Sequence, residues 1–261
     1  MRLVVLGDPV DHSLSPLIHN SAFAATNLIG SYDRRPVDAA GMAEAVAEIR
    51  DGALDGASVT MPHKELAAQL ADRLATSAQR VAVVNTLLRV GGAVVGHNTD
   101  IAGIEAAWVE AGFPADGPVL VLGAGGAAAA ALVALEGHEL TISSRRPEAV
   151  TALLQRVGVT ATVASWGTPV SGAVVVNATP LGMQGESLGA AILDAAGGLF
   201  DMVYGSRETP SVQAIKQNDL PVADGQRMLL HQAAAAFELW TGHQAPLAAM
   251  EAALGGHNAA R

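Results

Sequence analysis

The sequence predicts an α/β protein of two domains, in which the second domain is a doubly wound parallel sheet. Three observations support this prediction. Short apolar segments alternate with helical stretches along most of the 261 residues, as in α/β proteins. A glycine-rich turn follows an apolar strand near the middle of the chain. The last part of the chain is Ala-rich and helical without a further strand, so we expect C-terminal helices that return to the first domain.

The glycine-rich turn lies within residues 119–130, which read as a strand, a turn and a helix. The strand is a continuous apolar run, typical of a parallel strand covered on both faces. Gly123, Gly125 and Ala128 fit the fingerprint G-x-G-x-x-G/A, whose glycines let backbone amides approach a pyrophosphate at a helix N-terminus. Plain packing of an Ala-rich helix is the structural alternative. A membrane span is rejected, because the apolar run is shorter than about 20 residues and glycines interrupt it.

Composition limits the class of protein. Half of the residues are hydrophobic and only 3% are aromatic, so Ala, Val and Leu must make most of the core. A net charge of -10 argues against nonspecific binding to nucleic acid or an anionic membrane. The absence of cysteine excludes disulfides and thiolate chemistry, and no acidic or histidine cluster has metal-ligand spacing. The N-terminal apolar run is too short for a signal peptide, so we expect a cytoplasmic protein.

We expect residues 1–100 to form the first domain, with residues 236–261 packing back, and residues 101–235 to form a Rossmann domain. Ser15 is expected as a helix N-cap, before Pro16. A long helix from Asn98 to about Gly112 should lead into the second domain. The expected strands are 3–6, 56–62, 81–90, 93–96, 119–122, 139–143, 160–163, 173–177 and 199–201. The other expected helices are 16–26, 38–50, 64–74 and an Ala-rich region from 225 to about 254.

Four polar segments interrupt the apolar pattern of the first domain, each at a strand end or a strand-to-helix junction. They are residues 12–16, 59–64, 84–86 and 98–100. Ligands of open α/β sheets bind beyond the carboxyl ends of the strands. If the segments converge there, they form a pocket of hydroxyl, amide, ammonium and carboxylate groups. Such a pocket suits a polyhydroxylated substrate, because each buried hydroxyl needs a hydrogen-bond partner.

Motifs in a fixed order extend over nearly the whole chain. They are GDPV-x-HS-x-SP-x-x-HN (7–20), VTMPHK (59–64), VNT (84–86), G-x-NTD (96–100), GAGG (123–126), NATPLGM (177–183), D-x-VY (201–204) and G-x-x-ML-x-x-Q (225–232). Together they resemble the shikimate dehydrogenase family. The resemblance implies NADP-dependent, reversible reduction of 3-dehydroshikimate to shikimate, in the pathway that supplies aromatic amino acids.

The resemblance also implies roles for individual residues. Lys64 and Asp100 would be the catalytic pair at the reacting oxygen. The substrate would be bound by Ser13, Ser15, Thr60, Lys64, Asn85, Asp100, Tyr204 and Gln232. The cofactor would be bound by Gly123, Ala124, Gly125, Gly126, Ala127, Ser144, Arg145, Arg146, Asn177, Thr179, Met183 and Gly225.

Structural alternatives compete with several of these roles. A helix cap would fully explain Ser15. His12 and His63 could be hydrogen-bonded scaffold, and we do not expect either to act as an acid. Lys64 at a helix start is unusual, because a cation there opposes the helix dipole, and that cost favours a function. Asp100 is ordinary at a helix N-terminus, so its role depends on the motif and on Lys64.

The choice of cofactor can be read after the strand 139–143. An enzyme that uses NAD usually has an acidic residue there for the ribose 2′-hydroxyl. This chain has Ser144-Arg145-Arg146 instead, and guanidinium groups suit a 2′-phosphate. The family typically has Asn-Arg-Thr, which makes Arg145 the safest contact and Arg146 a second candidate. A basic pair at a helix start is the alternative reading. Ser58 also replaces a common Asn, which we expect to be tolerated.

Two other functions stay open from sequence. One is a quinate/shikimate dehydrogenase paralogue that uses NAD, against which the two arginines argue. The other is a sensor that binds NADP or shikimate without catalysis, against which the pair Lys64 and Asp100 argues. The expected partner is a small-molecule substrate, with neither nucleic acid nor membrane, and the expected assembly is a monomer or a homodimer.

Overall fold

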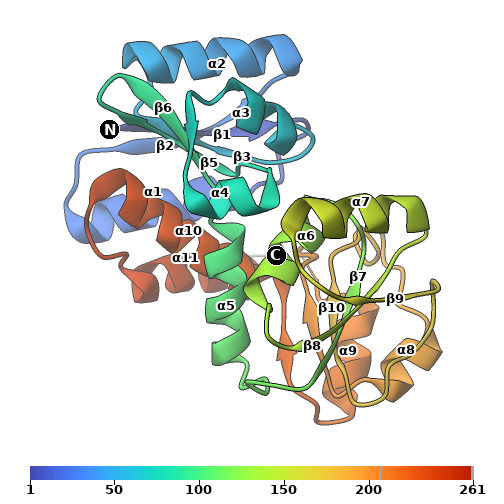
Figure 1. The fold of residues 1–261 in the computed structure, drawn as a ribbon. Coiled ribbons are helices and arrows are strands. Elements are labelled where there is room, and N and C mark those ends of the chain that lie inside the picture. The colour runs from blue at the N-terminus through green and yellow to red at the C-terminus, as the bar shows by residue number, and fades with distance from the viewer. Residues whose placement is uncertain (206, 260–261) are drawn as a thin grey trace. The chain divides into compact units, whose positions relative to one another are not determined.

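The computed structural model describes residues 1–205 and 207–259, and among these the side chains up to residue 256. The chain divides into two compact units. The first contains Met1–Asp100 and the chain from Leu230 onward, and the second contains Ile101–Leu229 (Figure 1). Each unit has its own six-stranded sheet, so the expected α/β fold of two domains is confirmed.

The first unit is a mixed sheet with the strand order β2-β1-β3-β5-β6-β4. Its strands are β1 (Arg2–Gly7), β2 (Ser31–Pro36), β3 (Gly56–Val59), β4 (Arg73–Leu74), β5 (Thr86–Val90) and β6 (Ala93–His97). β1 runs parallel to β2 and to β3, whereas β5 is antiparallel to both β3 and β6. β3 and β6 therefore point the same way, and their carboxyl ends reach the same edge as the amino end of β5.

Helices cover this sheet on both faces (Figure 1). On one face α2 (Ala39–Asp51), α3 (Lys64–Leu70) and α4 (Thr76–Val81) enclose a core that includes Met42, Ala67 and Ala78. On the other face lie α1 (Ser15–Thr26), α10 (Gly225–Thr241) and α11 (Leu247–Ala259). The Trp240 indole of α10 donates a hydrogen bond of 2.9 Å to the Leu87 carbonyl in β5. The return of the C-terminal helices to the first unit is therefore confirmed.

Four local expectations in the first unit are wrong. The strand expected over 56–62 ends at Val59. The helix expected over 64–74 ends at Leu70, because the chain turns extended and the Asp72 amide pairs with the Val94 carbonyl at 2.9 Å. The strand expected from residue 81 begins at Thr86, because Thr76–Val81 is helical and Ala82 caps that helix at φ 55°. Leu14, without a side-chain cap bond, is the N-cap of α1, so Ser15 lies inside the helix.

The second unit is a wholly parallel sheet with the strand order β12-β11-β10-β7-β8-β9. Its strands are β7 (Pro118–Leu122), β8 (Glu139–Ser143), β9 (Thr162–Ala164), β10 (Val174–Asn177), β11 (Gly198–Asp201) and β12 (Val222–Ala223). Its helices are α5 (Asp100–Glu110), α6 (Gly126–Ala134), α7 (Pro147–Val157), α8 (Ala190–Ala195) and α9 (Pro210–Gln217). The first strand of this unit, β7, lies between β8 and β10, so the strand order reverses there, as in a doubly wound Rossmann sheet.

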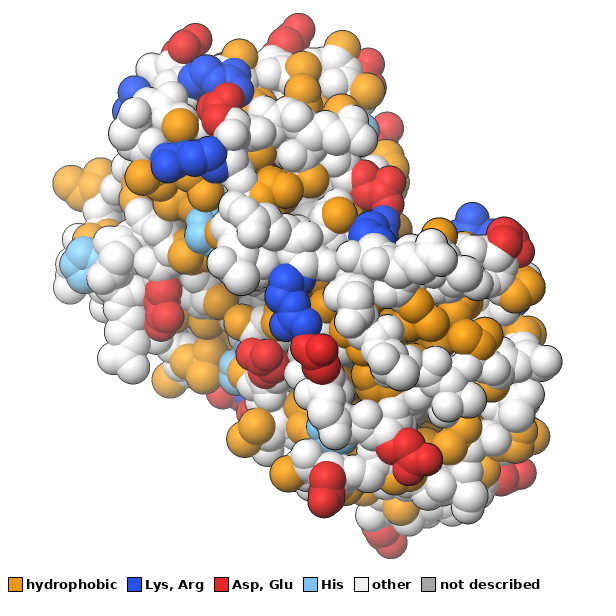
Figure 2. All heavy atoms as spheres, in the orientation of Figure 1, with side chains coloured by type: hydrophobic (Ala, Val, Ile, Leu, Met, Phe, Trp, Pro, Cys, Tyr) orange, Lys and Arg blue, Asp and Glu red, His pale blue; other side chains and the backbone are white. Residues whose placement is uncertain are grey.

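In the described part of the chain, no helix combines the length and the hydropathy that a membrane span requires. Figure 2 shows that Lys and Arg side chains on the visible face are mostly separated, with acidic side chains among them.

Candidate active site

The topology of the first unit brings the four polar segments to one edge of its sheet. Leu6 pairs with Val59, so the chain leaves β1 and β3 side by side. The Val59 amide donates to the Asn85 carbonyl at 2.8 Å, and the Asn85 amide donates to the His97 carbonyl at 3.1 Å. Segments that are far apart in sequence thus start or end at neighbouring positions, as the strand-end argument predicts.

Lys64 and Asp100 form an ion pair at this edge. Lys64 is the first residue of α3, and Asp100 is the first residue of α5. The Lys64 ammonium Nζ lies 2.5 Å from Asp100 Oδ2. The Asp100 side chain is 7% exposed and that of Lys64 is 23% exposed. A carboxylate as buried as that of Asp100 needs a partner of opposite charge, and the Lys64 ammonium is that partner.

Asn85 holds the second oxygen of the same carboxylate. Its amide Nδ2 donates to Asp100 Oδ1 at 2.8 Å and to Thr99 Oγ1 at 3.0 Å. Its Oδ1 accepts from the Thr99 amide at 2.8 Å and from Thr86 Oγ1 at 3.0 Å. Gln232 Oε1 lies 3.4 Å from Asn85 Nδ2 and also accepts from Thr99 Oγ1. Asp100 therefore has a partner on each oxygen, which fixes the plane of its carboxylate.

Three hydroxyl residues come from the segments that follow β1 and β3. Ser13 and Ser15 are buried, and Thr60 is half-buried. The Ser13 backbone is anchored from β2, because Arg34 donates to the Ser13 carbonyl from Nε at 3.1 Å and from Nη2 at 2.5 Å. Gly7 lets the two segments approach, since a Cβ there would lie 2.4 Å from the Thr60 methyl group.

The Ser15 hydroxyl forms no hydrogen bond to any other residue that the structure describes, and it does not cap α1. The amide of Ser15 instead donates to Ser13 Oγ at 3.3 Å. Helix capping, which was the alternative to a binding role for Ser15, is therefore excluded.

The two motif histidines take no part in the Lys64–Asp100 ion pair. His63 is buried, and its Nε2 lies 2.7 Å from the Val37 carbonyl, so it connects α3 to the loop after β2. His12 is exposed. His63 therefore has the scaffold contact that the sequence allowed for.

Thr86 and Thr99 complete the Asn85 network but were not among the predicted site residues, although the motifs VNT and NTD contain them.

The glycine turn of the second unit joins β7 to α6. Gly123 has φ +121°, and a Cβ there would lie 2.7 Å from the Ala178 carbonyl oxygen, so the turn itself requires glycine. Gly125 differs, because its backbone is extended and a Cβ would meet nothing within 4 Å. No side chain caps α6 at Gly125, and Ala128 is fully buried. The open space before an uncapped helix N-terminus fits a pyrophosphate that approaches the backbone amides of 123–127.

A second segment that contains predicted cofactor-binding residues follows β10. Asn177 is fully buried, and its Oδ1 accepts from Thr179 Oγ1 at 2.6 Å. Its Nδ2 donates to Asp201 Oδ1 at 2.9 Å. Burial raises the pKa of the Asp201 carboxyl, which also accepts from Thr209 Oγ1 at 2.6 Å. The sequence predicts no role for Asp201, which belongs to the motif D-x-VY. In the structure it holds the Asn177 side chain, and Asn177 in turn orients Thr179.

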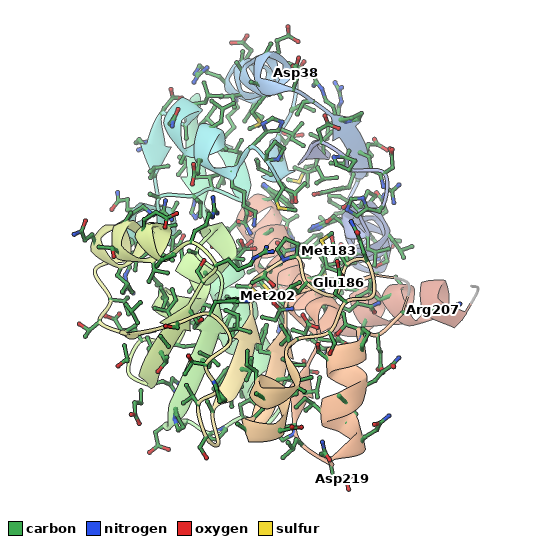
Figure 3. The ribbon with its side chains drawn as sticks, turned by 90° about the vertical axis from the view of Figure 1, so that its right-hand side faces the viewer. Asp38, Met183, Glu186, Met202, Arg207 and Asp219 are labelled. Atoms are coloured by element: carbon green, nitrogen blue, oxygen red, sulfur yellow. The ribbon has the colours of Figure 1, made fainter. Side chains whose placement is uncertain are left out.

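Met183 lies on the same segment and is 54% exposed. Figure 3 shows Met183 and Glu186 on this loop. The Glu186 carboxylate accepts from the Gly182 amide at 3.1 Å and the Gln184 amide at 3.0 Å. The backbone amide of Glu186 itself, together with those of Gln184 and Gly182, lowers the pKa of the Glu186 carboxyl. The Met183 side chain is therefore exposed to solvent on a loop that the Glu186 hydrogen bonds hold in place.

The arginine pair lies between β8 and α7. Arg145 and Arg146 are both exposed, and Ser144 Oγ accepts from the Arg146 amide at 3.2 Å. Arg146 is the N-cap of α7, ahead of Pro147. No carboxylate occurs between Ser143 and Pro147.

Two predicted site residues of the second unit lie apart from these clusters in sequence. Tyr204 is half-buried in the loop after β11. Gly225 begins α10, and a Cβ there would lie 2.6 Å from the Val203 carbonyl oxygen. Close packing alone therefore accounts for that glycine.

Comparison with known proteins identifies the family. Residues 5–87 match the shikimate dehydrogenase substrate binding domain, and residues 225–254 match the shikimate 5'-dehydrogenase C-terminal domain. "Shikimate dehydrogenase (NADP(+))" of Gluconobacter oxydans is 38% identical over 91% of this chain and 89% of its own length. The protein of that name from Thermus thermophilus is 37% identical over 93% of each chain.

Solved structures agree with the sequence comparison. Shikimate 5-dehydrogenase from Thermus thermophilus, in complex with NADP(H) and shikimate, matches with a TM-score of 0.87 and 36% identity over 97% of this chain and 98% of that one. Mycobacterium tuberculosis shikimate dehydrogenase matches with a TM-score of 0.85 and 33% identity over 98% of each chain. These matches confirm the resemblance seen in the motifs. The chain belongs to the shikimate dehydrogenase family.

Proposed function

We propose that this protein catalyses the reversible, NADPH-dependent reduction of 3-dehydroshikimate to shikimate, with Lys64 and Asp100 as its catalytic pair. The relatives named above are NADP-dependent oxidoreductases of this kind, and one is solved with both ligands. The observation that carries the assignment of the residues is the Lys64–Asp100 pair, which Asn85 holds at the carboxyl edge of the first sheet.

The cofactor, when bound, supplies the hydride that adds to the C3 carbonyl carbon. As the carbon–oxygen double bond becomes a single bond, the Lys64 ammonium donates a proton to the developing alkoxide. Shikimate leaves with that proton, and the neutral Lys64 amine regains one from solvent. In the reverse direction Lys64 accepts the hydroxyl proton. Asp100 orients the Lys64 Nζ through the 2.5 Å contact and accepts a hydrogen bond from a substrate hydroxyl.

The remaining polar side chains of the first unit would bind the substrate. Ser13 and Ser15 would hydrogen-bond the ring carboxylate, and Ser15 has its hydroxyl available. Thr60, Asn85 and Gln232 would hydrogen-bond the ring hydroxyls together with Lys64 and Asp100. The family motif D-x-VY implies that Tyr204 would also bind the substrate. Most of these residues lie within 1–100, so we assign residues 1–100, together with 236–261, to substrate binding and catalysis.

Residues 101–235 would bind NADP. The amides of Gly123, Ala124, Gly125, Gly126 and Ala127 would hold the pyrophosphate. Asn177, Thr179 and Met183 would flank the cofactor between phosphates and nicotinamide, and Ser144, Arg145 and Arg146 would bind the 2′-phosphate. Gly225 would lie beside the cofactor through its family motif. We further propose a cytoplasmic enzyme that works as a monomer or homodimer and, given its net charge of -10, binds neither nucleic acid nor membrane.

One assay tests this function against its competitors. The protein is incubated with shikimate or quinate and with NADP or NAD, and the absorbance of the reduced nicotinamide is followed. We expect turnover with shikimate and NADP. Quinate carries an additional hydroxyl on the carbon that bears the carboxylate, and burying it unpaired costs roughly 1–3 kcal/mol, so we expect a lower kcat/KM. Equal or better turnover of quinate with NAD would point to the paralogue, and absence of turnover in all four mixtures would point to a sensor.

A further inference from the structure

Trp166 is an exposed tryptophan in a chain that buries its other two. The residue is 37% exposed, whereas Trp108 and Trp240 are 5% and 8% exposed. Single exposed apolar residues are common and need no function by themselves. The exposure of Trp166 alone therefore assigns no function to it.

The sheet register supplies a second observation. Ser143, the last residue of β8, pairs with Ala164, the last residue of β9. Ser143 Oγ also donates to the Ser165 carbonyl at 3.0 Å. The two loops that continue from these strands, Ser144–Arg146 and Ser165–Trp166, therefore start side by side. This edge is where the second strand of a Rossmann sheet meets the adenosine ribose.

Arg145 and Trp166 meet across these loops. The Arg145 guanidinium carbon lies 6.0 Å from the centroid of the Trp166 ring, within the range of a cation–π contact. In the described chain, the Arg145 guanidinium has no hydrogen bond or ion pair with another residue. The N–H donors of Arg145 are therefore available to a ligand. The Trp166 ring restricts the position of the guanidinium but, because it is uncharged and accepts no ordinary hydrogen bond from it, leaves those donors free.

We propose that Trp166 is a positioning residue that pre-orients Arg145 for the 2′-phosphate of NADP. This inference rests on the proposed assignment of Arg145 to that phosphate. An exposed arginine side chain loses conformational freedom when it binds an anion, and a ring that already restricts it lowers this loss. Trp166 does not touch the phosphate, so it acts through Arg145 and contributes to selectivity between NADP and NAD.

The test compares dissociation constants for NADP+ and NAD+, measured by titration calorimetry, because the two ligands differ only in the 2′-phosphate. Trp166→Ala should weaken NADP+ binding roughly two- to five-fold, the range of an exposed cation–π contact, and leave NAD+ binding unchanged. Trp166→Phe should keep most of the NADP+ affinity, because a ring remains. Val163→Ala, which shortens an exposed apolar side chain of the neighbouring strand β9, is the matched control and should leave both constants unchanged.

A double-mutant cycle separates positioning from stability. In an Arg145→Ala background, Trp166→Ala should cause no further loss of NADP+ affinity, because the group that it positions is gone. Full additivity in the cycle, or an equal loss for NADP+ and NAD+, would overturn the inference. If the wild type does not prefer NADP+, the assignment of Arg145 and this inference both fail. The shikimate oxidation assay decides the proposed enzymatic function separately.

Discussion

Asn85 Nδ2 lies 2.8 Å from Asp100 Oδ1, while Lys64 Nζ contacts the other oxygen of the same carboxylate at 2.5 Å. The carboxylate is thus held between a neutral donor and a cation. In the proposed mechanism the Lys64 ammonium donates the proton. Because Asp100 positions that ammonium and Asn85 positions Asp100, the Asn85 amide would orient Lys64 indirectly. Hydrogen-bonded networks of this kind are coupled, so removal of one member affects the others.

Asn85→Ala should therefore lower kcat as well as weaken shikimate binding. A hydrogen bond to a charged group contributes about 1.5–3 kcal/mol, which corresponds to roughly a ten- to hundred-fold loss in kcat/KM. Steady-state kinetics with varied shikimate measures this effect. Gln79→Ala, which removes an exposed amide whose Nε2 bonds the Leu74 carbonyl, is the control. A change in KM for NADP alone would contradict the role given to Asn85.

Arg145→Ala should raise KM for NADP about ten-fold or more. Charge-assisted hydrogen bonds to a phosphate contribute roughly 1.5–3 kcal/mol, and solvent exposure moves the value toward the lower end. KM for NAD should change little, because NAD has no 2′-phosphate. Arg146→Ala should have a smaller effect, and the double variant a larger one. Equal weakening of both cofactors by Arg145→Ala would mean that the arginine is structural.

His19 should make the first unit acid-sensitive. It is fully buried, its ring stacks on Tyr32 at 4.4 Å between centroids, and neither ring nitrogen has a hydrogen-bond partner in the described structure. Burial lowers the pKa of His19 from 6.5 to about 3. The unfolded chain therefore binds a proton below pH 6.5 that the folded chain does not. Stability should fall as the pH drops from 6.5 toward 3, by up to about 1.4 kcal/mol per pH unit, and should be unaffected by this group above 6.5.

Urea unfolding at neutral pH and at about pH 5 measures this dependence. His19→Phe should make the free energy of unfolding less dependent on pH over this interval, while His12→Gln, a change at an exposed histidine, should keep the wild-type dependence. An unchanged dependence in His19→Phe would show that other groups cause the acid sensitivity.

Sequence patterns predicted the elements whose signal is local. The strand 139–143 is found with those bounds, and the apolar run 119–122 became β7 with one more residue. The doubly wound order and the returning helices were also predicted. The polar segments could be expected to converge, because strand ends share an edge of the sheet.

The missed elements depend on contacts distant in sequence. β2 was not predicted, because an edge strand with the sequence SYDRRP is mostly exposed and lacks an apolar pattern. β4 and β12 are two residues long and exist only through pairing with β6 and β11. The Asn85 contact to Asp100 and the meeting of Arg145 with Trp166 likewise depend on strand register, which no local pattern contains.

The kinetics of Lys64→Ala test the central claim most directly. Lys64 is assigned as the proton donor to the alkoxide, so its loss should lower kcat by about 10²- to 10⁴-fold, the usual range for a positioned acid or base. The dissociation constant for NADP should barely change, because Lys64 belongs to the first unit and the glycine turn belongs to the second. Lys216→Ala, which removes an exposed lysine paired with Glu208, is the matched control. The account predicts a large loss of kcat with unchanged NADP affinity in Lys64→Ala alone, and a variant with near-normal kcat would contradict it.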